Sequence, residues 1–240
     1  MTYPSRPLRR IRIREPHRCF CPQDVISYNM DGFYTLPGNI TVDTRGGRPP
    51  PRFTYDAMGN PTSYLGKTLT WDGKQLKKAE FGSGTSYCFY EYKYDENGLR
   101  ARKTFSAPAL SLSETTEYYY NGSVLIGMKI GTGSSAKILR FSYDANGSVV
   151  AVDYSTDNGS NFTTYYYLRN AQNDIVKIID STGTTVVEYI YDSWGKALSV
   201  TGSLTNSLGL DQPFRYRGYV YDNETSEPSL YILNEVFTIL

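Results

Sequence analysis

The stretch YYYLRNAQNDIVKIIDSTGTTVVEYIYDSWG, residues 165–195, contains two runs of β-branched and aromatic residues separated by turn-forming residues. Residues Ile175–Ile179 and Val186–Tyr191 have the composition of strands, and the DSTG between them is typical of a hairpin turn. After the second run, Asp192 can accept hydrogen bonds from backbone amides two or three residues further on, and Gly195 can adopt a positive φ. The motif Tyr-Asp-x-x-Gly is therefore predicted to end a strand.

An aromatic residue followed by Asp or Asn recurs along the chain from Phe53 onward. The pairs are Tyr55-Asp56, Trp71-Asp72, Tyr94-Asp95, Tyr120-Asn121, Tyr143-Asp144, Tyr191-Asp192 and Tyr221-Asp222, and Gly59, Gly98, Gly147 and Gly195 follow four of the Asp residues at a spacing of three. The longest interval between successive pairs divides into two similar steps if Tyr167 is a degenerate member. A period in the twenties indicates stacked supersecondary units, and all the pairs, including those in WDGK and YYYNG, are expected to form the same turn. Similar side chains at equivalent turns are poor candidates for one catalytic pocket.

The composition agrees with strands and turns. The 240 residues include 23 Tyr and 21 Gly, and no segment keeps apolar residues at helical spacing beyond two turns. We predict an all-β fold of consecutive antiparallel hairpins. The net charge is +1, which offers no field to attract nucleic acid or an anionic membrane. No apolar window reaches the length of a membrane span or of a signal peptide, so neither is expected.

Three regions differ in composition. Residues 1–52 contain nine Arg and no Lys together with a Pro and Gly cluster, and they are expected to be poorly ordered. Residues 53–212 contain the repeats. Residues 213–240 begin with the block PFRYRGYVYDNET, and Arg215 and Arg217 in it are expected to flank Tyr216 on one face of a strand, where they would bind acidic residues of a neighbouring hairpin.

The repeats and this block resemble the tyrosine-aspartate (YD) repeats of rearrangement-hotspot (RHS) proteins, which include bacterial wall-associated proteins, insecticidal toxin-complex components and teneurins. The residues Pro213, Phe214, Arg215, Tyr216, Arg217, Gly218 and Tyr219 resemble the start of the RHS-associated core. The resemblance implies a spiral of β-hairpins that forms the wall of a hollow shell. The implied partner is the protein's own C-terminal segment, which is often a toxin. The resemblance implies that the wall takes no part in the catalysis by that toxin. An extracellular or wall-associated location is also implied.

The chain departs from the family pattern at both ends. After residue 225 it reads SEPSLYILNEVFTIL, and it lacks the Asp-Pro-x-Gly motifs linked to self-cleavage in the family, so no cleavage residue is carried over. The expectation is a repeat fragment between out-of-frame or rearranged flanks. Two alternatives to the shell wall remain open. One is a surface adhesin that binds glycans through its tyrosines, and the other is a non-functional remnant of a rearranged locus.

Candidate metal and catalytic sites are weak. The segment HRCFC, residues 17–21, offers three soft ligands, and a zinc site would need a fourth such as Cys88. His17 is the single histidine, so a catalytic triad would depend on the least ordered region. The segment STDNGSN, residues 155–161, lacks the alternating acids of a calcium loop. We therefore predict no catalytic residue, no cofactor and no metal.

Overall fold

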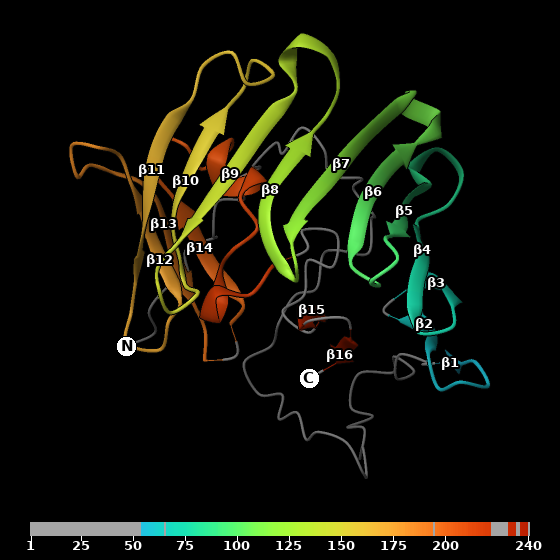
Figure 1. Ribbon diagram of the computed structural model, residues 1–240. Coiled ribbons are helices and arrows are strands. Elements are labelled where there is room, and N and C mark those ends of the chain that lie inside the picture. Colours follow the sequence, from blue (N-terminus) through green and yellow to red (C-terminus); the bar gives the residue numbers. More distant parts are fainter. Residues whose placement is uncertain (1–53, 65, 194, 222–229, 234–235, 240) are drawn as a thin grey trace, which may run out of the picture.

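The computed structural model describes residues 54–64, 66–193, 195–221, 230–233 and 236–239 (Figure 1). Fourteen strands form one antiparallel sheet in which every strand pairs with its neighbours in sequence. They are β1 Thr54–Tyr55, β2 Pro61–Tyr64, β3 Lys67–Asp72, β4 Gln75–Phe81, β5 Cys88–Tyr94, β6 Arg100–Ala107, β7 Leu112–Asn121, β8 Val124–Ile130, β9 Lys137–Tyr143, β10 Val149–Ser155, β11 Thr163–Arg169, β12 Ile175–Ile179, β13 Thr185–Tyr191 and β14 Ala197–Thr201. The predicted all-β architecture of consecutive hairpins is confirmed.

Helical structure is scarce in the described residues. A four-residue helix, α1, spans Leu208–Asp211, and 3-10 turns span Gly84–Ser86, Pro108–Leu110, Gly133–Ser135 and Tyr216–Gly218. Two further strands, β15 Leu230–Leu233 and β16 Val236–Ile239, pair with each other. None of the helices in the described ranges is long and apolar enough to cross a membrane.

Side chains alternate between the two faces of the sheet, as the period of two in a strand requires. In β9, Leu139 and Phe141 are buried, whereas Arg140 and Ser142 are exposed. The largest core cluster extends along the inner face from β7 to β13 and includes residues of the segment after β14. Figure 1 shows the sheet curving around this face, with the orange and red segment after β14 on its concave side.

The connections between strands alternate between two rims. One rim, which we call the YD rim, carries the turns at 56–60, 73–74, 95–99, 122–123, 144–148, 170–174 and 192–196. The pairing register shifts at the strand ends beside all seven of these turns. A bulge of this kind bends the strand and increases its twist. Among the described residues, seven of the eight register shifts in this sheet thus lie at the YD rim, and the eighth, between Ile178 and Ile179, lies at the opposite rim.

After β14 the chain crosses to the concave face. Gly202 adopts φ +120°, and the Leu204 N–H donates to the carbonyl of Val186. The α1 helix is then attached through Asp211, whose carboxylate accepts hydrogen bonds from Lys137 Nζ (2.8 Å) and from the hydroxyl of Tyr154 (2.6 Å). The segment 202–221 is therefore anchored inside the curve of the sheet.

Candidate functional site

The five-residue turns of the YD rim use their Asp side chain as an internal hydrogen-bond acceptor. In the turn 95–99, Asp95 Oδ1 accepts the N–H groups of Asn97 and Leu99, both at 2.9 Å. The Gly98 N–H donates to the Asp95 carbonyl, and Gly98 has φ +81°. Asp56, Asp144 and Asp192 accept the N–H four residues later in the same way, and Gly59, Gly147 and Gly195 also have positive φ. These carboxylates shape turns along one rim and do not converge.

The electrostatics of the turns follow from these hydrogen bonds. The N–H of Asn60 lowers the pKa of Asp56 because it stabilises the carboxylate. On the opposite rim, hydrogen bonds from Ser155 and from the Asn161 N–H lower the pKa of Asp157 to about 2. Both carboxylates stay ionised at neutral pH and are occupied by neighbouring donors.

The turns at Asp72 and Asn121 differ from the prediction that all the aromatic pairs form the same turn. Asp72 pairs with Gln75 and Asn121 pairs with Val124, so each connection is a two-residue hairpin turn. Gly follows the Asp or Asn directly at both places, with φ +60° and +59°. The glycine stands at the first central position of each turn, where a type II′ hairpin turn needs positive φ, and the second central residues, Lys74 and Ser123, have no positive φ.

One repeat member was also predicted at the wrong residue. Tyr167, taken as the degenerate aromatic, lies inside β11 and is buried. The turn is formed instead by Asn170, whose Oδ1 accepts the N–H groups of Gln172 and Asp174, both at 2.9 Å. Asn173 occupies the position of the usual glycine with φ +71°. Asn accepts hydrogen bonds as Asp does and tolerates positive φ, so the spacing Asn-x-x-Asn was the signal that identifies this turn.

At six of the seven turns, a side chain at the end of the strand before the turn makes the same kind of contact. Each donates to a backbone carbonyl within the first two residues of the preceding strand, and we call this contact a rim clamp. The clamps are Trp71 to Pro61, Tyr94 to Leu76, Tyr120 to Arg100, Tyr143 to Leu125, Arg169 to Val149 and Tyr191 to Ile175. Each clamp ties together the two open ends of one hairpin. The first repeat tyrosine, Tyr55, is 59% exposed at the start of the sheet.

Burial keeps the phenol of the clamp residue Tyr143 protonated. The pKa of Tyr143 rises to about 12 because desolvation opposes the phenolate. Burial raises the pKa of Tyr167 and of Tyr189 as well. The hydroxyls of Tyr143 and Tyr189 therefore act as neutral donors at physiological pH, whereas that of Tyr167 makes no hydrogen bond among the described residues, and none of the three is suited to act as a base.

The core-motif residues form a compact loop on the concave face. The Tyr221 N–H donates to the Pro213 carbonyl at 2.7 Å, which closes the loop. Phe214 packs edge-on against Phe141 and Tyr143, with ring centroids 4.8 and 6.3 Å apart. The loop is thus joined to the inner surface of β9.

The two arginines of this loop do not share a strand face, because residues 216–218 form a 3-10 turn in which Arg217 has φ +53°. Arg215 is buried and donates from Nη2 to the Gly209 carbonyl at 2.9 Å. Arg217 is exposed, and its backbone N–H, not its guanidinium, donates to Asp174 Oδ1 at 2.9 Å. Tyr216 donates to the Ser193 carbonyl. The predicted pair of acid-binding arginines is therefore wrong.

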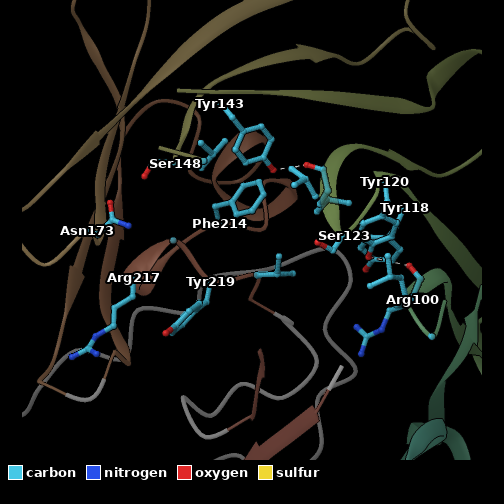
Figure 2. Close-up of a pocket in the computed structure, with 18 of the residues that line it drawn as sticks. Arg100, Tyr118, Tyr120, Ser123, Tyr143, Ser148, Asn173, Phe214, Arg217 and Tyr219 are labelled. Atoms are coloured by element: carbon cyan, nitrogen blue, oxygen red, sulfur yellow. Dashed lines mark hydrogen bonds between the residues drawn. The ribbon is translucent and has the colours of Figure 1, made fainter. Parts of the chain in front are cut away.

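A cavity of about 730 Å³ lies between this loop and the inner face at the YD rim. Figure 2 shows Phe214 and Tyr219 facing Tyr118, Tyr120 and Arg100 across it. In the part of the chain that the structure describes, the cationic side chains that line it are Lys74, Arg100, Arg169 and Arg217, and this lining includes neither Asp nor Glu. Gly218 also contributes to the lining. The cavity thus combines cations, aromatic rings and neutral hydrogen-bonding groups.

The remaining candidate residues are accounted for as follows. His17, Cys19, Cys21 and Asp222 lie outside the described residues. Cys88 is buried at the start of β5. In the part of the chain that the structure describes, no group of three or more His, Cys, Asp or Glu could hold a metal. Asp157 of the 155–161 loop accepts hydrogen bonds from within that loop.

Relatives of known name match the chain over most of its length, whereas no protein-family model matches it. The tRNA3(Ser)-specific nuclease WapA of Bacillus spizizenii is 34% identical over 173 residues, and the tRNA nuclease WapA of Bacillus subtilis is 35% identical over 172 residues. Each match covers 72% of this chain and 7% of the relative. The chain therefore spans less than a tenth of the length of these relatives.

Solved structures share the fold at lower sequence identity. The crystal structure of TcdB2-TccC3 superposes with a TM-score of 0.59 at 17% identity, and the Photorhabdus luminescens Tc holotoxin pore with a TM-score of 0.60 at 17% identity. Each covers 75% of this chain and 9% of the other. At this level of identity the likeness concerns the arrangement of the strands.

Proposed function

The chain belongs to the RHS family of YD-repeat proteins, and from this membership we propose that its sheet is a non-catalytic wall segment of a container enclosing a C-terminal polypeptide. The observation that carries the proposal is the path of the chain after β14. Residues 202–221 turn onto the concave face and are attached there through Asp211 and Tyr189, whose hydroxyl donates to Gly209 and accepts from Gln212. Tyr221, at the end of this segment, is held to the Pro213 carbonyl by its N–H on the concave side of the sheet.

The strand order supports a wall. Each internal strand is paired on both edges, so the sheet can be lengthened by further hairpins without leaving backbone groups unpaired between units. The curved sheet presents aromatic side chains inward, which suits the shielding of a partly unfolded polypeptide from water and from proteases.

We propose that the enclosed polypeptide is a toxin, in accordance with the nuclease names of the relatives. The nuclease activity itself is not assigned to this segment. The recurrent carboxylates at the YD rim are engaged in turns, as at Asp95 and Asp144, and the buried phenols are neutral. An extracellular or wall-associated location is part of the same proposal.

A second candidate is glycan binding by the outer face. Tyr119 and Tyr166 are the central members of two Tyr-Tyr-Tyr runs, and they are 48% and 43% exposed, on the face opposite the core. Exposed aromatic rings can stack on sugars. A glycan array with the Tyr119→Ala/Tyr166→Ala variant as control tests this candidate, since binding that the two substitutions abolish supports an adhesin.

The container is tested by grafting. Residues 54–221 replace the matching stretch of Bacillus subtilis WapA, and the purified chimera is digested with thermolysin while fragments from its C-terminal region are followed by mass spectrometry. We expect these fragments to appear only under conditions that unfold the sheet. A matched chimera carrying Tyr143→Phe and Tyr191→Phe, which weakens two clamps, should release them earlier. Digestion of the C-terminal region at the rate of the isolated region would refute the proposal.

A further inference from the structure

The cavity beneath the core-motif loop differs in charge from the rest of the molecule. Residues 54–221 contain sixteen Lys and Arg and sixteen Asp and Glu, so this region is neutral as a whole. Among the described residues, the cavity lining nevertheless contains four cations and no carboxylate. Asp56 and Asp144, which interact electrostatically with Lys74 and Arg169, lie outside the lining, so these four cations are the charged groups that the described residues present to the hollow.

The four cations come from separate parts of the rim. Lys74 lies in the turn between β3 and β4, Arg100 begins β6, Arg169 ends β11 and Arg217 lies in the loop after β14. Arg100 is 7% exposed, and its guanidinium lies 4.4 Å from the centre of the Tyr92 ring. A charge held in a site of low dielectric interacts more strongly with an incoming anion than a surface charge does.

The neutral part of the lining is suited to a peptide. Gln75, Ser123, Ser148 and Asn173 provide side-chain hydrogen-bond donors and acceptors, and phenolic and phenyl rings provide apolar contact. The volume of about 730 Å³ is in the range of ligand pockets and suits a short extended segment. A duplex nucleic acid is too wide for such a hollow, and the neutral surface around it supplies no extended basic track.

We propose that this cavity binds a carboxylate-rich, extended polypeptide segment. The inference rests on the proposed container function and gives it a partner class, namely acidic stretches of the enclosed polypeptide. Lys74 and Arg100 attract the carboxylates from one side of the cavity, and Arg169 and Arg217 attract them from the other.

The test is direct binding to the full 240-residue chain, which does not require a closed container. The probe is a fluorescent polyglutamate peptide of about ten residues, which spans at most about 33 Å when extended, and its binding is followed by anisotropy. We expect saturable binding that polyglutamine lacks. Raising the salt from about 0.05 M to about 0.5 M should weaken it about tenfold. The Lys74→Gln/Arg100→Gln variant should bind about fivefold more weakly or worse.

The matched control is Arg102→Gln/Lys177→Gln, which removes the same charge from ion pairs of the outer face, with Glu117 at 2.8 Å and Glu188 at 3.1 Å. It should bind as the unmodified chain does. If Lys74→Gln/Arg100→Gln unfolds, Lys74→Gln alone should still weaken binding. Equal loss in the control, equal binding of polyglutamine, or binding only of citrate or of a short oligodeoxythymidine would overturn the proposal. If the peptide binds but the C-terminal region of the chimera is not protected from thermolysin, the container proposal is refuted and the proposal of peptide binding stands.

Discussion

The rim clamps predict that a single hydroxyl stabilises a single hairpin. Tyr143→Phe removes the O–H that donates to the Leu125 carbonyl while leaving the ring against Phe214, at a centroid distance of 6.3 Å. The packing of the inner face is thus conserved, and the perturbation is restricted to one hydrogen bond between the end of β9 and the start of β8.

The magnitude follows from the environment of that bond. A hydrogen bond contributes about 0.5–1.5 kcal/mol net, and a buried acceptor left without a donor costs about 1–3 kcal/mol. The contact is partly buried beside the cavity, so we expect a loss of about 1.5 kcal/mol. That loss corresponds to about a tenfold increase in local opening.

Hydrogen exchange followed by mass spectrometry measures this opening hairpin by hairpin. Peptides from β8 and β9 should exchange about tenfold faster in Tyr143→Phe, whereas peptides from β4 and β5 should not change. The control is Tyr119→Phe, which removes a hydroxyl bonded to Glu117 on the exposed face and should change exchange little. Equal acceleration in both variants, or acceleration spread over the whole sheet, would refute the clamp as a local device.

Three further predictions address other features. Asp174→Ala removes the acceptor of the Arg217 N–H and should destabilise the core-motif loop by about 2 kcal/mol. Trypsin should therefore cleave this loop faster in the variant. An unchanged rate of cleavage would contradict the prediction. Gly202→Ala places a Cβ 2.2 Å from the Val186 carbonyl oxygen and should destabilise by about 3 kcal/mol in urea unfolding, whereas Gly147→Ala, with open space around it, should cost about 1 kcal/mol. The pKa of Tyr143 is raised from 10.0 to about 12, so its contribution is complete below pH 10 and is lost as pH rises to about 12; unfolding titrations of Tyr143→Phe should show a shallower loss over that interval.

The fold could be predicted from the sequence because its signals are local. Alternating apolar residues set the inner face of each strand, and Asp-x-x-Gly sets the turn, so the hairpin from Ile175 to Tyr191 was located to within one residue at Thr185. The turn of Asn170 and Asn173 was not predicted because the pattern required an aromatic residue directly before the Asp or Asn, and Arg169 stands there, whereas the geometry requires an acceptor followed by a residue that tolerates positive φ.

The site depended on contacts that the sequence does not display. The clamp of Tyr191 reaches a carbonyl sixteen residues earlier, and that of Tyr120 reaches one twenty residues earlier. The cavity brings Lys74 together with Arg217, which are separated by most of the sheet's sequence. The prediction of a strand around Arg217 is wrong because the positive φ of Arg217 reverses the direction of the chain. Non-local geometry of this kind has no periodic signature.

All six clamps lie at the YD rim, and this limits which changes in the number of strands keep the clamps together. Each clamp joins a strand only to the one before it, so an in-frame duplication or deletion that adds or removes two strands leaves every other clamp intact. Loss of a single strand would remove one clamp donor or its partner carbonyl, would reverse the direction of all the strands that follow, and would move their clamps to the opposite rim. Length variants that keep all their clamps on one rim should therefore differ by even numbers of strands, about 23 residues at a time if each hairpin unit keeps the spacing seen between Tyr120 and Tyr143.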